Sequence, residues 1–357
     1  MPFKKSHRTT FESVPLGNDA LTALADRVEV PTYDRSALSP AVVHLGVGGF
    51  HRAHQLVYFD DLAERRISTD WGVVGVGMRS SSMRDALRPQ DYLFTVVEKG
   101  ACGEKGRVVG VMGDYVFAPE SPDEVLETLS APGTRLVTLT VTANGYPVDL
   151  DTGEFDDLAP EIVTDRQHPK APRSVFGYLV RALDQRRQAG LAPFTVLSCD
   201  NIPHNGDAAR TAVCSLAALI DPTLADWIDE HVSFPSSMVD RITPETSVAE
   251  RDAIAVRLGV DDRWPVITEP FSQWIVEDDF CNGRPPLDQV GVQFVTDVQP
   301  YKVVKTRLLN AAHSAVGFLG YLSGYRTMHQ AMADPVIAGT WTGCSPRSAR
   351  CCRPCPG

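Results

Sequence analysis

Three polar side chains, Lys305, Asn310 and His313, stand close together in an otherwise apolar stretch of the sequence. On a regular α-helix they fall at about 0°, 140° and 80°, so one broad face could present all three. An ammonium, an amide and an imidazole are an unusual set for such a face. The structural alternative is a lysine at a helix start, an asparagine bonding locally and a buried, hydrogen-bonded histidine. This stretch alone does not decide between chemistry and packing.

A glycine-rich turn is the second candidate site. The apolar run Ala41–Leu45 predicts a buried strand, the turn GVGGF follows it, and the pattern of residues 53–66 predicts a helix. A dinucleotide-phosphate loop requires this order, because glycines let the backbone approach the pyrophosphate and the helix N-terminus supplies N–H donors. His51 replaces the third glycine of the usual fingerprint, and a tight turn without a ligand is the alternative. Because an expected strand precedes the turn and an expected helix follows it, we favour cofactor binding at Gly46, Gly48, Gly49 and Phe50.

The residues after the second expected strand, Trp71–Val76, bear on which cofactor is bound. An acid at the end of this strand would bond the ribose hydroxyls of NAD, whereas an arginine with hydroxyls accommodates the 2′-phosphate of NADP. The sequence here is Met78–Arg79–Ser80–Ser81–Ser82, with no acid before Asp85. The choice between NAD and NADP therefore stays open, and a merely solvated Arg79 is an equal alternative.

Two further segments carry polar residues that a site could use. Phe194–Cys199 predicts a buried strand, and Asn201 follows its carboxyl end, where ligands bind in open parallel sheets. The proline-bounded segment 234–244 carries Asp240 next to Arg241. Alone, such a pair is more often a structural ion pair than a site.

The order of elements predicts an α/β fold with a doubly wound, Rossmann-like sheet. Further strands are expected at 92–98, 106–111 and 135–142, and helices at 174–188, 208–219 and 224–231. Past Pro300 the pattern becomes helical. The expected organisation is an N-terminal arm (1–40), a dinucleotide-binding domain (41–295), the start of a mostly helical substrate domain (296–338) and a tail (339–357).

Composition narrows the class of protein. The 357 residues are 43% hydrophobic and 22% charged, with a net charge of −11, which argues against nucleic acid or an anionic membrane as a partner. The start of the chain does not look like a secretory signal, and no apolar run reaches the length of a membrane span, so a cytoplasmic location is expected. The nine histidines and four early cysteines show no zinc-ligand spacing, and hydrolase and P-loop motifs are absent.

Four motifs in order resemble the polyol-specific long-chain dehydrogenases: HLGVGGFHRAHQ, LSCDNIPHNG, FPSSMVDRITP and K-x4-N-x2-H. The resemblance runs from about Ala41 to Pro335. It implies hydride transfer between a nicotinamide cofactor and a polyol, D-mannitol to D-fructose and back. A uronate reductase of the same family is one alternative, and an inactive dinucleotide-binding fragment is another. The expected partners are a small polyol or keto-sugar, with the chain a monomer or weak oligomer.

The resemblance also implies roles for individual residues. Lys305 matches a general base, Asn201 and Asn310 match two amides that stabilise an alkoxide, and His313 and Asp240 match substrate-orienting groups. The family uses no zinc for this step. A desolvated lysine has its charged form disfavoured, which moves its pKa towards neutral and suits it to accept a hydroxyl proton.

The end of the chain departs from the family. The family pattern continues to about Pro335. The chain then ends in the tail GTWTGCSPRSARCCRPCPG, which has four closely spaced cysteines and no acidic residue. A zinc knuckle is a weak alternative, and a shifted reading frame or truncated product is favoured. The resemblance then implies that helices covering the 305–325 helix are missing. An exposed apolar face, poor solubility or weak activity is expected.

Overall fold

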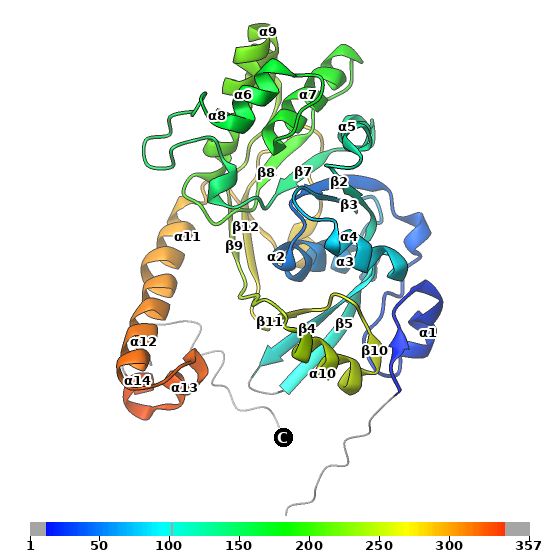
Figure 1. The fold of residues 1–357 in the computed structure, drawn as a ribbon, viewed down its shortest axis with the longest axis vertical. Helices are drawn as coiled ribbons and strands as arrows, with labels where there is room; N and C mark the ends of the chain where they lie inside the picture. Colours follow the sequence, from blue (N-terminus) through cyan, green and yellow to red (C-terminus); the bar gives the residue numbers. More distant parts are fainter. Residues whose placement is uncertain (1–11, 101–102, 340–357) are drawn as a thin grey trace, which may run out of the picture. The chain divides into compact units, whose positions relative to one another are not determined.

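The computed structural model describes residues 12–100 and 103–339, and the chain divides into two compact units. Unit 1 consists of Met1–Lys99 and Lys105–Val295, and unit 2 of Gly100–Glu104 and Thr296–Gly357. Figure 1 labels their elements. The cysteine-rich tail lies outside the described residues.

A five-stranded parallel sheet forms the centre of unit 1. Its strands lie in the order β6-β3-β2-β7-β8, with bounds Met112–Phe117, Gly72–Gly77, Pro40–Leu45, Leu136–Leu139 and Thr195–Ser198. The order grows outward from β2 in both directions, which makes this a doubly wound sheet, as the sequence predicted. Strand β6 was not expected from the sequence. In it, exposed Gly113 and Asp114 interrupt the apolar run that marks a buried strand.

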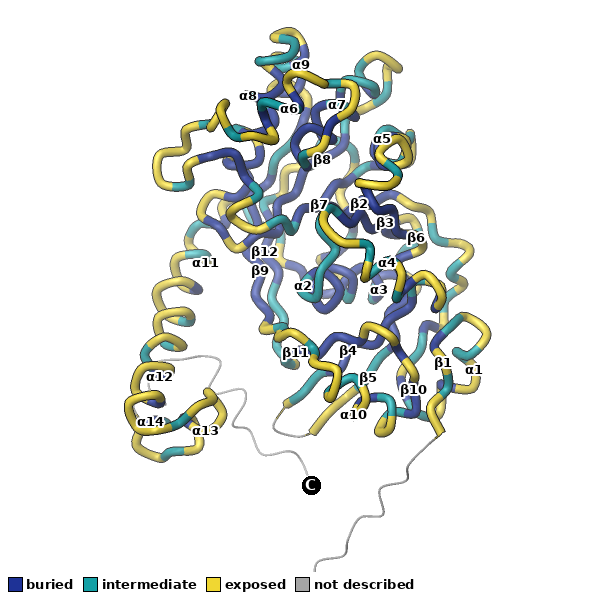
Figure 2. The backbone as a smooth tube through the Cα atoms, in the orientation of Figure 1, coloured by how far each residue is buried: buried dark blue, intermediate teal, exposed yellow. Residues whose placement is uncertain are grey.

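Helices cover both faces of this sheet because alternate residues of each strand point to opposite sides. Val42 and Val73 pack on one face with Leu56 and Phe59 of α3 (Gln55–Glu64). Val43 of the same strand packs on the other face. The helices on that second face are α5 (Pro122–Ser130), α7 (Val175–Gln188), α8 (Asn205–Ile220) and α9 (Pro222–His231). In Figure 2 strands β2 and β3 are buried almost throughout.

The helix expected at 53–66 is present as α3, and a short helix that was not expected, α2 (Gly49–Ala53), precedes it. The two helices are separated at His54, whose φ of −119° and ψ of −82° lie outside helical geometry. The ring of His54 stacks on Phe50 and hydrogen-bonds the carbonyl of Gln273, 2.9 Å away. These contacts with another part of the fold compete with helix continuity, and sequence periodicity does not reveal them.

Smaller sheets and short helices complete unit 1. The sheets are β11-β4-β5 (Val266–Thr268, Phe94–Gly100, Gly103–Val109), β13-β12-β9 (Gln293–Val295, Gln273–Glu277, Ser237–Asp240) and β1-β10 (Val14–Pro15, Val260–Asp261). The remaining helices are α1 (Leu21–Leu24), α4 (Ser82–Leu87), α6 (Pro160–Gln167) and α10 (Val248–Leu258). Single 3-10 turns occur at Asn18–Ala20, Arg35–Ala37, Arg88–Gln90, Ala143–Gly145 and Leu287–Val290.

Unit 2 is helical and begins with α11 (Gln299–Val304). The regular α-helix expected through residue 310 is wrong, because η6 (Lys305–Asn310) is π-helical before α12 (Ala311–Leu322) resumes. Helices α13 (Met328–Ala333) and α14 (Pro335–Gly339) pack on α12 through Val316, Ala331 and Ile337. Figure 2 shows these helices largely exposed, and Phe318 and Leu322 are 73% and 82% exposed.

Among the described residues, no helix combines the length and apolar character that crossing a membrane requires.

Candidate functional site

The turn after β2 lies where the strand order of the sheet reverses, between β2 and β7. Gly46 has a φ of +98°, and a Cβ there would lie 2.4 Å from the carbonyl oxygen of Thr140. Its N–H donates to Val76 of β3 and its carbonyl accepts from the Thr140 hydroxyl of the β7 side. Only glycine meets both conditions. The turn is therefore held from both sides at the place where open α/β sheets bind ligands.

The other predicted loop residues have different geometries. Gly48 is extended (φ −136°), and a Cβ there would meet nothing closer than 3.8 Å. Gly49 opens α2, so the N–H groups of Gly49 and Phe50 belong to the first turn, which has no intrahelical acceptors. The loop thus leaves free backbone donors and open space beside them.

A cavity of about 550 Å³ lies along the carboxyl ends of β2, β3 and β7. We call it the crevice. Gly46 and Arg79 are the two predicted site residues that it brings together. The rest of its lining is contributed by the turn after β2, the segment after β3, strand β6, the loop after β7, helix α6 (Pro160–Gln167), the start of α7 and the segment before β11. It includes Val47, Met78, Ser80, Ser82, Thr140, Thr142, Asn144, Glu161, Arg173 and Trp264.

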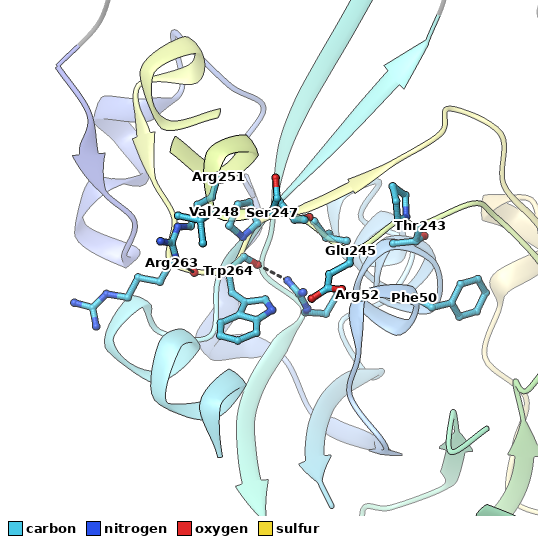
Figure 3. Close-up of a pocket in the computed structure, with 14 residues that line it drawn as sticks. Phe50, Arg52, Thr243, Glu245, Ser247, Val248, Arg251, Arg263 and Trp264 are labelled. Carbon is cyan, nitrogen blue, oxygen red and sulfur yellow. Dashed lines mark hydrogen bonds between the residues drawn. The ribbon is translucent and has the colours of Figure 1, made fainter. Parts of the chain in front are cut away.

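A second cavity, of about 460 Å³, lies beside α2, and Gly49 and Phe50 line it (Figure 3). Arg52 reaches into its wall, where its Nη1 donates to the carbonyl of Trp264 and its guanidinium lies over the Phe94 ring. Burial lowers the pKa of Arg52 to about 10, so the group stays charged at neutral pH. Since Trp264 lines both cavities, Arg52 fixes the wall that they share.

A histidine stack explains why the third glycine of the fingerprint is missing. His51 lies flat on His44 of β2, with ring centroids 3.3 Å apart and planes 3° apart. His44 hydrogen-bonds the hydroxyls of Thr138 and Thr140. Burial lowers the pKa of His44 to about 3 and that of His51 well below its usual value. Two neutral rings thus give the close strand–helix contact that a glycine usually permits.

The loop after β8 is held by residues that sequence reasoning missed. The buried carboxylate of Asp200 accepts hydrogen bonds from the N–H groups of Val141 and Thr142 and from the hydroxyl of Tyr146. Burial raises the pKa of Asp200. The side chain of Asn205 bonds Ser198 and Asp200 of the same strand end, and also both backbone groups of Ser237. The available signal was the run DNIPHNG itself, since Asp and Asn side chains bond nearby backbone at turns.

The predicted residue Asn201 lies between these two anchors. It is exposed and directly follows Asp200. The two hydrogen bonds from the loop after β7 to the Asp200 carboxylate, which we call the Asp200 clamp, therefore fix the backbone next to Asn201. A rigidly held, exposed amide beyond the carboxyl end of a strand can donate to a ligand.

Asp240 is the last residue of β9 and is buried. The adjacent Arg241 forms its ion pair with Glu98 and donates to the carbonyls of Ala53 and Glu269. The structure therefore gives Arg241 a packing role, and its ion-pair partner is Glu98.

The other predicted residues belong to unit 2. Lys305 begins η6 and is buried, Asn310 ends η6, and His313 follows on the first turn of α12. Asn310 and His313 are exposed. A π-turn joins residues five apart, so Lys305 and Asn310 lie about one turn from each other instead of diverging by about 140°.

No group of three or more histidine, cysteine or acidic side chains able to hold a metal ion occurs within 12–100 and 103–339.

Comparison with known families gives two adjoining matches. A family model described as the mannitol dehydrogenase Rossmann domain matches residues 40–289, and one described as the mannitol dehydrogenase C-terminal domain matches residues 297–344.

Curated relatives agree with these matches. The mannitol 2-dehydrogenases of Phaeosphaeria nodorum and Aspergillus terreus are each 46% identical to the chain over 87% of its length. The chain spans 56% and 64% of those two proteins.

Solved structures show the same fold. The ternary complex of Pseudomonas fluorescens mannitol 2-dehydrogenase with NAD and D-mannitol has a TM-score of 0.86 and 45% identity, covering 96% of this chain and 71% of that one. A substrate-free D-sorbitol dehydrogenase has a TM-score of 0.86 and 40% identity, covering 91% of this chain and 68% of that one.

Proposed function

The chain belongs to the mannitol dehydrogenase family, and we propose that it transfers a hydride between a polyol and NAD, oxidising D-mannitol to D-fructose reversibly. The glycine turn at the switch point of the sheet carries this proposal. Gly46 has no room for a side chain, and the space beside Gly48 is open to an approaching ligand. These features fit the pyrophosphate of a dinucleotide, whose two ends would extend to either side of β2.

The chain's own residues then supply the proton chemistry. When bound, the nicotinamide ring accepts the hydride from the carbinol carbon. The Nζ of Lys305, as a free amine, takes the proton of the same carbinol hydroxyl, so that one C–H and one O–H bond break as the C=O bond forms. Lys305 is buried, which keeps the proton transfer away from bulk water.

Two amides stabilise the charge that develops on oxygen. The side-chain amides of Asn201 and Asn310 donate hydrogen bonds to the alkoxide. These hydrogen bonds stabilise the negative charge most strongly where water is excluded. His313 and Asp240 bind other hydroxyls of the polyol and hold the reacting carbon in place. In this proposal Lys305 accepts the hydroxyl proton and the two amides stabilise the oxyanion, so the step does not require zinc.

The test is NADH formation from D-mannitol by the purified chain, with Lys305→Ala as the matched variant and NADH fluorescence as a separate measure of cofactor binding. Lys305→Ala should lower turnover by about 10² to 10⁴ and leave NADH binding unchanged. A chelator should leave the wild-type rate unchanged.

The outcomes separate the alternatives. Turnover by Lys305→Ala at the wild-type rate would exclude the lysine base. NADH binding without any turnover would support a dinucleotide-binding fragment, and preferential reduction of fructuronate over fructose would support a uronate reductase.

A further inference from the structure

The segment after β3 lacks the group that normally selects NAD. β3 ends at Gly77, and no carboxylate follows before Asp85. An acid at this strand end binds the ribose hydroxyls of NAD and repels the 2′-phosphate of NADP. Its absence removes that repulsion from the end of the crevice where the ribose would lie.

Two carboxylates close to the segment after β3, those of Asp85 and Glu120, are already paired. Asp85 accepts from the Ser81 hydroxyl at 2.8 Å and pairs with Arg84 at 2.8 Å. The same Arg84 also pairs with Glu120. Of the acids, only Glu161 lines the crevice.

Two arginines in the lining, Arg79 and Arg173, form no ion pair with any described residue. The guanidinium groups of Arg79 and Arg173 have neither a hydrogen-bond acceptor nor an ion-pair partner among the described residues, and both line the crevice. They come from separate segments, after β3 and before α7. The backbone at Arg173 is fixed, because its N–H and that of Ser174 donate to the buried carboxylate of Asp165.

Two hydroxyls lie in the same part of the lining. The Oγ atoms of Ser80 and Ser82 are 2.8 Å apart, and the N–H of Ser82 donates to Ser80. Each hydroxyl can rotate to donate outward. Guanidinium and hydroxyl donors together match the acceptor oxygens of a phosphate monoester.

We propose that Arg79 and Arg173, with the hydroxyls of Ser80 and Ser82, bind the 2′-phosphate of NADP, so that this chain uses NADP as well as NAD. This inference rests on the proposed function, because it places the adenosine ribose of the cofactor in the crevice. It assigns to Arg79 a role in cofactor selection that the family resemblance does not imply.

The test compares two small probes by calorimetry, 2′,5′-ADP and 5′-AMP, which differ only in the 2′-phosphate. The wild-type chain should bind 2′,5′-ADP at least about tenfold more tightly, as expected for charge-assisted hydrogen bonds. Arg79→Ala should remove most of that difference and leave 5′-AMP unchanged. Ser80→Asp should reverse the preference, because it restores an acid at the strand end.

Arg88→Ala is the matched control, since it removes the same charge from an exposed residue near the segment that does not line the crevice. It should keep the preference for 2′,5′-ADP. Equal binding of the two probes by the wild type, or an equal loss of preference in Arg88→Ala, overturns the inference. If neither probe nor NADH binds, the dinucleotide site of the proposed function fails with it, whereas NADH binding without a 2′-phosphate preference defeats the inference alone.

Discussion

Lys305 and Asn310 are the first and last residues of one π-helical turn, with regular α-helix on either side. A π-turn corresponds to an α-helix with one extra residue, and such turns occur frequently at functional sites. Here it brings a buried amine and an exposed amide about one turn apart. In an uninterrupted α-helix the same two residues would point about 140° away from each other.

Because Lys305 and Asn310 are aligned by a π-turn, we predict that the chain keeps its turnover when one residue of this turn is deleted. Removing the exposed Thr306 should convert η6 to α-helix, in which Lys305 and the asparagine become four residues apart and about 40° from alignment. Turnover with D-mannitol should stay within about tenfold of that of the intact chain, because the alignment of base and amide is kept.

Inserting an alanine after Thr306 is the opposite change, and it should abolish turnover while circular dichroism keeps its helical signal. An alanine inserted after Ser323, beyond α12, serves as the control for insertion itself. A deletion variant that folds but is as inactive as Lys305→Ala would contradict this account of η6.

A second prediction concerns the glycine turn. Gly46→Ala should lower the free energy of unfolding by about 2–4 kcal/mol, because the new Cβ overlaps the Thr140 carbonyl and the residue has a positive φ. NADH binding should be lost as the turn moves. Urea denaturation followed by tryptophan fluorescence measures the stability.

Gly48→Ala is the matched control, since its backbone is extended and the nearest atom to a Cβ is 3.8 Å away. Its free energy of unfolding should change by less than about 1 kcal/mol, the usual range for a substitution that meets neither strain nor overlap. Equal destabilisation by the two variants would show that the Gly46 geometry is unimportant.

A third prediction concerns the clamp behind Asn201. Asp200→Ala removes the acceptor of three hydrogen bonds, from the partly buried N–H groups of Val141 and Thr142 and from the buried hydroxyl of Tyr146, and should destabilise the chain by about 3 kcal/mol. Tyr146→Phe removes one of these bonds together with the bond to the Ser198 hydroxyl, and should cost about 1–2 kcal/mol. Thermal and urea unfolding measure both. If Asp200→Ala were no worse than Tyr146→Phe, the carboxylate would not be what holds the two loops together.

A fourth prediction concerns acid sensitivity. The pKa of buried His44 is lowered to about 3, so the unfolded chain binds a proton at this residue below about pH 6.5 and the folded chain does not. Its contribution to stability is complete above pH 6.5 and is lost progressively as the pH falls towards 3. Between pH 7 and pH 5 the loss should be about 2 kcal/mol. His51, whose pKa is also lowered by burial, should add to it.

The measurement is the free energy of unfolding at pH 5, 6 and 7 for the wild type and His44→Gln. The variant should show a shallower decline, because glutamine can bond Thr138 and Thr140 but does not titrate. The exposed His168→Gln serves as the control and should keep the wild-type slope. Parallel curves for all three proteins would rule out His44 as the source of the acid sensitivity.

Sequence patterns were enough to predict four of the five strands of the central sheet (β2, β3, β7 and β8), the glycine turn and the family. Strands such as β2 and β7 are buried on both faces, so they appear as short continuous apolar runs, and Gly46 is required by local geometry. These are local properties, and local patterns report them. The catalytic roles of Lys305, Asn201, Asn310, His313 and Asp240 rest on the motifs and remain predictions.

Features that depend on partners far apart in the chain could not be predicted from sequence patterns. The break at His54 depends on Gln273, the clamp of Asp200 depends on the loop after β7, and the stack of His51 depends on His44 of β2. The π-turn of η6 likewise departs from a periodicity that assumes one uniform helix. Spacing along the sequence cannot report contacts of this kind, because their energy comes from groups that folding brings together.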